Sequence, residues 1–253
     1  MAQTRARMID EPYARSAVWS KRLGLFALPV GIIAVFAQRS GKLDYLPAVA
    51  ALGSAVLLAI AAILLAVIAL AVIWVRGNRG AGAATAGVLA GVLVLAAPLY
   101  FVVPGLELPP LTDVATDPAN PPAFVFAAAE RKPGENPLAY PGESAAVAQM
   151  AAYPELQSLT VSQTPEETHA LAQQLVEQRG WRILDSNPAT GRIEAVATSL
   201  ILRMHDDIVI QIKPDTAGAR VDMRSASRAG QRDFGANAAR IRAFLAELQT
   251  AAR

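Results

Sequence analysis

Long apolar runs occupy most of the first hundred residues. Residues 46–75 and 81–106 contain no Asp, Glu, Lys, Arg or His. A helix over 46–75 is ~45 Å long, more than the ~30 Å hydrocarbon core of a bilayer, so both runs predict spanning helices. A third run, 23–37, is shorter, but Lys21 and Arg22 can reach back to the headgroups, which extends the predicted span to about 18–37. We therefore expect a membrane domain over 1–106 with three transmembrane helices.

The pattern changes after residue 106. Residues 107–122 are dense in proline and predict an extended stalk, because proline lacks an N–H and disfavours helix. Residues 123–253 predict a folded domain that begins with two short helices. Strand and helix patterns then follow in the order β-α-β-β-β-β-α, with strands at about 159–161, 181–184, 192–198, 206–213 and 219–227.

Two helices in this domain carry clear local signals. Thr164, Pro165 and Glu167 form the sequence of a capping box with proline at the first helical position. The last helix, about 235–248, places Ile241 and Phe244 on one apolar stripe. The predicted fold class is therefore a membrane-anchored α+β protein, with an antiparallel sheet and two helices against one face.

Charge is divided unevenly along the chain. Residues 1–106 carry nine Lys/Arg and three Asp/Glu, and residues 107–253 carry fourteen and eighteen, so the net charges are +6 and −4. The basic excess flanks the apolar runs, and we expect no nucleic-acid partner. The chain has no cysteine, which excludes disulfides and thiolate chemistry.

Topology depends on the first apolar run. If it spans, seven Lys/Arg lie on the cytoplasmic side and two on the outer side, and the large domain is extracytoplasmic. If it does not span, seven Lys/Arg are again cytoplasmic and two are outside, but the large domain is then cytoplasmic. The apolar stretch FALPVGIIAVFA favours insertion. We expect a multi-pass protein of the cytoplasmic membrane, with a cytoplasmic N-terminus and an extracytoplasmic C-terminal domain.

The stretch RSASRAGQRDFGANAAR is the main candidate for a binding site. Guanidinium groups and a helix N-terminus favour phosphate or carboxylate, which predicts an anion site at the following residues: Arg224, Ser225, Ser227, Arg228 and Asn237. The alternative is a structural ionic network with carboxylates that could neutralise the same arginines. Its members would be Asp206, Asp207, Asp222, Asp233 and Arg240. The sequence leaves both readings open, with the structural one favoured.

Other chemistries have weaker support. His205, Asp206 and Asp207 resemble a metal-ligand cluster, with His169 as a remote fourth group, and alternation would put His205 and Asp207 on one strand face; we nevertheless expect no metal. A G-x-S-x-G elbow is absent, which disfavours a hydrolase. The glycines of GAGAATAG lie in an apolar run without the strand and acidic residue of a dinucleotide site, so no cofactor is expected.

Four separated blocks resemble one known family. They are PPLTDVATDPANPPAF, GWRILDSNPATGRIEA, the aspartate pair of HDDIVIQI, and RVDMRSASRAGQRDFGANAARIRAFL. Together they resemble the domain of unknown function 1499 family between Pro109 and Leu248, whose membrane-anchored members have similar N-terminal spans. The lead into the aspartate pair, SLILRMHDD, departs from the family pattern. The resemblance implies an architecture and no activity.

Two functional classes follow. The first is a membrane-anchored binding or assembly module of the cell envelope, in contact with the lipid bilayer and with an anionic envelope component or another membrane protein. The second is an envelope enzyme with an Asp/Arg-based site. A concave pocket that holds Arg224, Arg228 and an unpaired carboxylate would favour the enzyme.

Overall fold

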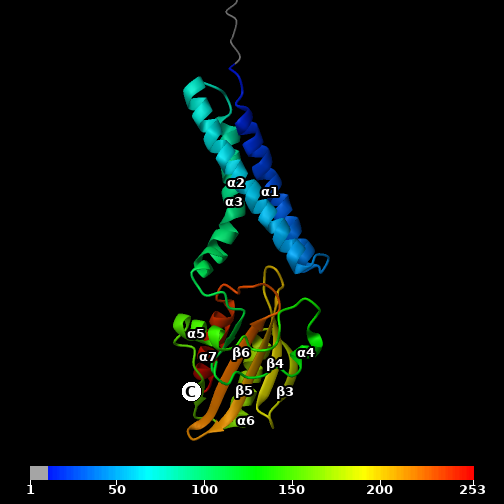
Figure 1. The fold of residues 1–253 in the computed structure, drawn as a ribbon, viewed down its shortest axis with the longest axis vertical. Helices are drawn as coiled ribbons and strands as arrows, with labels where there is room; N and C mark the ends of the chain where they lie inside the picture. The colour runs from blue at the N-terminus through cyan, green and yellow to red at the C-terminus, as the bar shows by residue number, and fades with distance from the viewer. Residues whose placement is uncertain (1–10) are drawn as a thin grey trace, which may run out of the picture. The chain divides into compact units, whose positions relative to one another are not determined.

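The computed structural model describes residues 11–253, and it divides at Phe101 into a membrane unit and a C-terminal unit that begins at Val102 (Figure 1). Arg5 and Arg7, which enter the charge count, lie outside the described residues. Each unit is described by itself below.

The membrane unit contains three helices, α1 (Arg15–Arg39), α2 (Tyr45–Arg76) and α3 (Ala81–Phe101). Each is long and apolar enough to cross a membrane, which confirms the three predicted spans and implies contact with a lipid bilayer. The third helix ends earlier than predicted. Residues Val103–Leu106 form the short 3-10 helix η1, because Pro104 has no N–H with which to continue α3.

Small residues bring the three helices close together. A Cβ atom on Gly87 of α3 would lie 1.9 Å from Ser20 Oγ of α1, and one on Gly91 would lie 2.8 Å from Ile63 Cγ1 of α2. The two glycines thus face two different helices of the same bundle. Helix α2 adds a buried row of alanines that includes Ala55, Ala59, Ala62, Ala66 and Ala69. Such close approach is how apolar helices associate in a membrane, where burial of apolar surface gives no advantage.

The C-terminal unit is built on a six-stranded antiparallel sheet. Its strands are β1 (Asp113–Ala115), β2 (Leu159–Val161), β3 (Arg182–Asn187), β4 (Arg192–Thr198), β5 (His205–Asp215) and β6 (Gly218–Ser227). Their order is β1-β6-β5-β4-β3, and β2 also pairs with β6. Strand β1 pairs with residues 224–226 of β6 and β2 with residues 219–221, so the two short strands share one edge of β6. The predicted order β-α-β-β-β-β-α is confirmed, with β1 added.

Strand β1 corrects the prediction that residues 107–122 form a stalk. Leu111 and Val114 are buried in the main core, and Asp113 pairs with Ala226. The edge of β1 that faces away from β6 is hydrogen-bonded by a side chain. Gln149 Oε1 accepts from Ala115 N at 3.0 Å, and Gln149 Nε2 donates to Ala115 O at 2.6 Å. Three residues among prolines give no periodic signal, so the sequence pattern did not reveal this strand.

Four helices accompany the sheet, α4 (Ala127–Glu130), α5 (Glu143–Ala152), α6 (Pro165–Gln178) and α7 (Ala236–Ala251). The capping box of α6 is present as predicted, with Thr164 and Glu167 bonded reciprocally. Helices α6 and α7 pack on one face of the sheet, where Phe244 and Ile241 lie in the core (Figure 1).

The opposite face of the sheet is polar and has a different cover. Side chains alternate along β6, so Val221 and Met223 join the core while Arg220, Asp222 and Arg224 point to the other side. Residues 116–142, which we call the cover segment, lie over that side and include α4. The sheet is therefore sandwiched between an apolar helical layer and an irregular layer held by polar contacts.

Candidate functional site

The five residues of the predicted anion site do not converge. Arg224 and Arg228 bond to groups on the cover-segment side of the sheet. Ser225, Ser227 and Asn237 bond to one another on the helical side. The alternation of β6 separates them, because neighbouring residues of a strand point to opposite faces.

Arg224 fastens the cover segment to the sheet. Its guanidinium group donates to both carboxylate oxygens of Asp113, at 2.9 and 2.6 Å, and to the carbonyl oxygens of Pro122 and Leu138. The rings of Phe124 and Tyr140 lie 4.6 and 5.4 Å from the same group. Four segments of the chain therefore meet at one buried side chain.

Burial dominates the ionisation of the groups around Arg224. It raises the pKa of Asp113 above the ordinary value, although the hydrogen bonds and charge of Arg224 act in the opposite direction. Burial also raises the pKa of the Tyr140 phenol to about 12, with a further contribution from the charge of Asp113. These groups are closed within the fold, as expected of structural partners.

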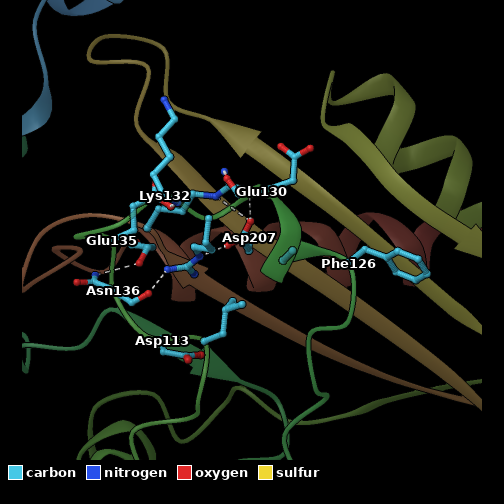
Figure 2. Close-up of polar contacts among 12 residues, drawn as sticks. Asp113, Phe126, Glu130, Lys132, Glu135, Asn136 and Asp207 are labelled. Carbon is cyan, nitrogen blue, oxygen red and sulfur yellow. Dashed lines mark hydrogen bonds and ion pairs between the residues drawn. The ribbon is translucent and has the colours of Figure 1, made fainter.

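Asp207 binds two arginines. Arg228 donates to Asp207 Oδ1 at 3.0 and 2.6 Å, and Arg131 of the cover segment donates to Oδ2 at 2.7 Å. Figure 2 shows Asp207 facing the residues that follow α4, with Asn136 and Glu135 on the same side and Phe126 pointing away. Arg131 also donates to the Asn136 carbonyl, and its Nη2 is buried with no hydrogen-bond partner within residues 11–253.

These contacts define the ionic layer, which consists of Asp113, Asp207, Arg131, Arg224 and Arg228. Every side chain in it is 8% exposed or less. Breaking a buried ion pair leaves an uncompensated charge in a poorly solvated place and costs about 3–5 kcal/mol. The ionic layer thus supports the structural reading of the arginines.

Glu194 is a buried residue that anchors part of the fold, and its role was not predicted from the sequence. It is fully buried on β4 and accepts hydrogen bonds from the backbone N–H groups of Val125, Phe126 and Ala127, at 2.7–3.1 Å. Arg192 neutralises it from two residues away, at 2.9 Å. The only sequence signal is one acidic residue inside an otherwise apolar strand. Glu194 anchors the start of α4 to the sheet.

The helical face carries a separate polar network. Arg240 bonds to Asp206 and to Ser225 Oγ, and Asn237 bridges Ser225 and Ser227. The network ties the end of β6 to the first turns of α7.

Asp233 lies just before α7 and accepts from the N–H groups of Gly235 and Asn237, both at 2.9 Å, which satisfies donors at the start of the helix. Burial raises its pKa. Asp206 and Asp207 are adjacent in sequence and serve opposite faces of the sheet.

Asp222 binds an arginine that is partly exposed to solvent. Its carboxylate binds Arg220, with Nε to Oδ2 at 3.1 Å, and accepts from the hydroxyl groups of Thr116 and Ser158. Arg220 also binds Asp117 at 2.8 Å. Unlike the members of the ionic layer, the Arg220 side chain remains 42% exposed.

Arg220 lies on the wall of a large cleft in the C-terminal unit, which we call the α5 cleft. The α5 cleft has a volume of about 970 Å³ and lies between α5, the approach to β2 and residues 116–121. One wall is apolar, with Val147 57% and Met150 54% exposed. The other wall carries Arg220 and hydroxyl groups. No sequence motif marks this cleft, because its walls come from segments more than a hundred residues apart.

The histidines do not form a hydrolytic or metal site. His169 Nε2 lies 3.3 Å from the Arg192 carbonyl and 3.4 Å from Ser186 Oγ, and that hydroxyl donates to Gln173 instead. His205 Nδ1 contacts Thr198, and burial followed by the charge of Arg228 lowers its pKa. Within residues 11–253 no three metal-ligating side chains come together. Of the carboxylates predicted for an ionic network, Asp206, Asp207 and Asp222 each pair with an arginine, whereas Asp233 bonds to backbone N–H groups.

Comparison with known proteins identifies the C-terminal unit. A comparison with curated proteins finds no match. A family model described as protein of unknown function (DUF1499) matches residues 113–248, which is more than half of the chain and includes all six strands of the sheet. The chain therefore belongs to the DUF1499 family of proteins of unknown function.

Proposed function

We propose that this chain is a membrane-anchored binding protein, whose C-terminal unit holds an envelope component in the α5 cleft on the outer side of the cytoplasmic membrane. The observation that carries the proposal is the α5 cleft itself. It is a large concavity with an exposed apolar wall and converging polar groups, which is the usual form of a binding site.

The arginines of the ionic layer support this assignment indirectly. Because Arg224 and Arg228 bind Asp113 and Asp207, their charge is not free for an anionic ligand. A pocket that holds both arginines and an unpaired carboxylate would have favoured an enzyme, and neither arginine lines the α5 cleft. Binding at the cleft therefore remains the function best supported by the geometry.

Orientation is tested with a cysteine introduced into this cysteine-free chain. Gln174 is exposed on α6, so Gln174→Cys is expected to react with a membrane-impermeant maleimide in intact cells, or in spheroplasts where an outer membrane intervenes. Gly218, the first residue of β6, is less suitable for the introduced cysteine. Its φ is +133°, and a Cβ atom there would lie 2.4 Å from the Val161 carbonyl oxygen. Labelling that appears only after the cytoplasmic membrane is lysed would place the unit inside.

Occupancy of the cleft is tested with the same reagent. Val147→Cys lies on the open apolar wall and is expected to react readily in the purified protein. In cells the bound component should slow that reaction by at least tenfold, while Gln174→Cys reacts equally in both samples. Equal reactivity of Val147→Cys in cells and in the purified protein would contradict the proposal.

A further inference from the structure

The walls of the α5 cleft differ in charge and polarity, and these differences indicate what kind of ligand fits. The charged side chains that line it are Asp117, Glu143, Asp215 and Arg220, which sum to −2. A concave site lined by one sign of charge raises the local concentration of ligands of the opposite sign. An anion is therefore disfavoured and a cationic group favoured.

The carboxylates retain capacity to accept hydrogen bonds. Within residues 11–253, the exposed Asp215 side chain bonds to Thr160 and Thr216, and that of Asp117 bonds to Arg220 and to the Asn120 N–H. A carboxylate offers about four lone-pair sites, and each of these two has unused ones. Glu143 is exposed at the start of α5. A lysine or arginine side chain could bind at several of these positions.

Arg220 supplies the complementary group, a hydrogen-bond donor. Its Nη2 donates to Asp117, Ser158 and Asp222, and its Nε lies 3.1 Å from Asp222 Oδ2 without forming a hydrogen bond. Its Nη1 also makes no hydrogen bond within residues 11–253. Because two carboxylates already neutralise Arg220, the free Nη1 suits an uncharged acceptor such as a main-chain carbonyl better than a second anion.

The remaining wall is apolar and adaptable. Val147 and Met150 are exposed on α5, and Pro118 and Pro121 line the rim. A methionine side chain is unbranched and polarisable, which lets it pack against apolar groups of different shapes. This wall can take apolar side chains from the same ligand that places its cationic group on the carboxylates.

We propose that the α5 cleft binds an extended peptide segment of a partner protein, in which a lysine or arginine is flanked by apolar residues. The carboxylates bind the basic side chain, Arg220 Nη1 binds a main-chain carbonyl, and the apolar wall receives the flanking side chains. This inference rests on the proposed function, since it names the ligand class of the same cleft.

The experiment uses the full chain in detergent and a displayed library of random nine-residue peptides. Selected peptides are expected to carry a central Lys or Arg with apolar neighbours. One of them, labelled with a fluorophore, should bind Glu143→Gln/Asp215→Asn at least tenfold more weakly than the unchanged chain, because two of three negative charges on the cleft are lost. Binding to Met150→Asp should be weakened as strongly by loss of the apolar wall.

The matched control is Glu166→Gln/Glu177→Gln, which removes the same charge from the exposed surface of α6 and should leave binding unchanged. All these positions are exposed, so the fold is not at risk. Selection of acidic or neutral peptides, no selection at all, or equal weakening by the control would each overturn the ligand class. Protection of Val147→Cys in cells would then still report that something else occupies the cleft.

Discussion

A fragment of residues 102–253 is expected to unfold cooperatively without the membrane helices, whereas a fragment of residues 123–253 is not expected to fold. The shorter fragment lacks β1, and with it Asp113, the charged partner of the buried Arg224. An unpaired buried charge alone costs about 3–5 kcal/mol, and whole domains are stable by only about 5–15 kcal/mol. The buried side chains Leu111 and Val114 are lost as well.

Trp181 makes this experiment direct, because it is the only tryptophan in either fragment and its ring lies 5.6 Å from that of Phe244 in the core. Its fluorescence should show a single sigmoidal urea transition for 102–253. A fragment of residues 108–253, which keeps β1 and omits η1, is the control and should unfold nearly as cooperatively. If 123–253 gave the same midpoint as 102–253, β1 would be dispensable.

Arg224→Ala is expected to lower the free energy of unfolding of the 102–253 fragment by about 3–5 kcal/mol. The change removes the partner of Asp113 and releases the carbonyls of Pro122 and Leu138 from the sheet. Arg242→Ala is the control, since Arg242 and Glu155 form an ion pair whose side chains are half exposed, and such pairs contribute at most about 1 kcal/mol. Equal denaturant midpoints for the two variants would mean that the ionic layer does not hold the fold.

The loss caused by Arg224→Ala should depend on pH in a defined direction. Arg224 lowers the pKa of Asp113 and burial raises it, so removal of the arginine leaves the folded-state pKa further above the ordinary 3.8. A raised folded-state pKa contributes stability below pH 3.8, and that contribution disappears as the pH rises through the folded-state value. The difference between the two proteins should therefore be smallest near pH 3 and grow toward neutrality. A difference that stays constant from pH 3 to 7 would show that Asp113 is not the group left unpaired.

Local signals in the sequence predicted the regular elements well. The capping box at Thr164 and the stripe through Ile241 and Phe244 are confirmed, because both depend on spacings within one helix. The strands from 192 onward follow their period-two patterns for the same reason. These features are fixed by residues close together in the chain.

The sequence predicted that arginines would pair with carboxylates, but it did not predict which residues would pair. The sequence indicated that Arg224 and Arg228 would find carboxylates, but it offered Asp206, Asp207, Asp222 and Asp233 as their partners. The actual partner of Arg224, Asp113, lies 111 positions away in a proline-rich segment without any periodic pattern. Contacts between distant segments depend on which strands pair, and no spacing in the sequence encodes that. The α5 cleft was missed for the same reason.

The adjacent aspartates of β5 have a consequence for how the sheet assembles. Asp206 binds Arg240 of α7, and Asp207 binds Arg228 and Arg131 on the other side. If β5 slipped by one residue against its neighbours, each carboxylate would face the wrong layer and Ile208 would enter the polar one. A misaligned sheet would thus lose its ion pairs on both faces at once. The two aspartates therefore favour the native register, because a one-residue slip would cost ion pairs on both faces of the sheet.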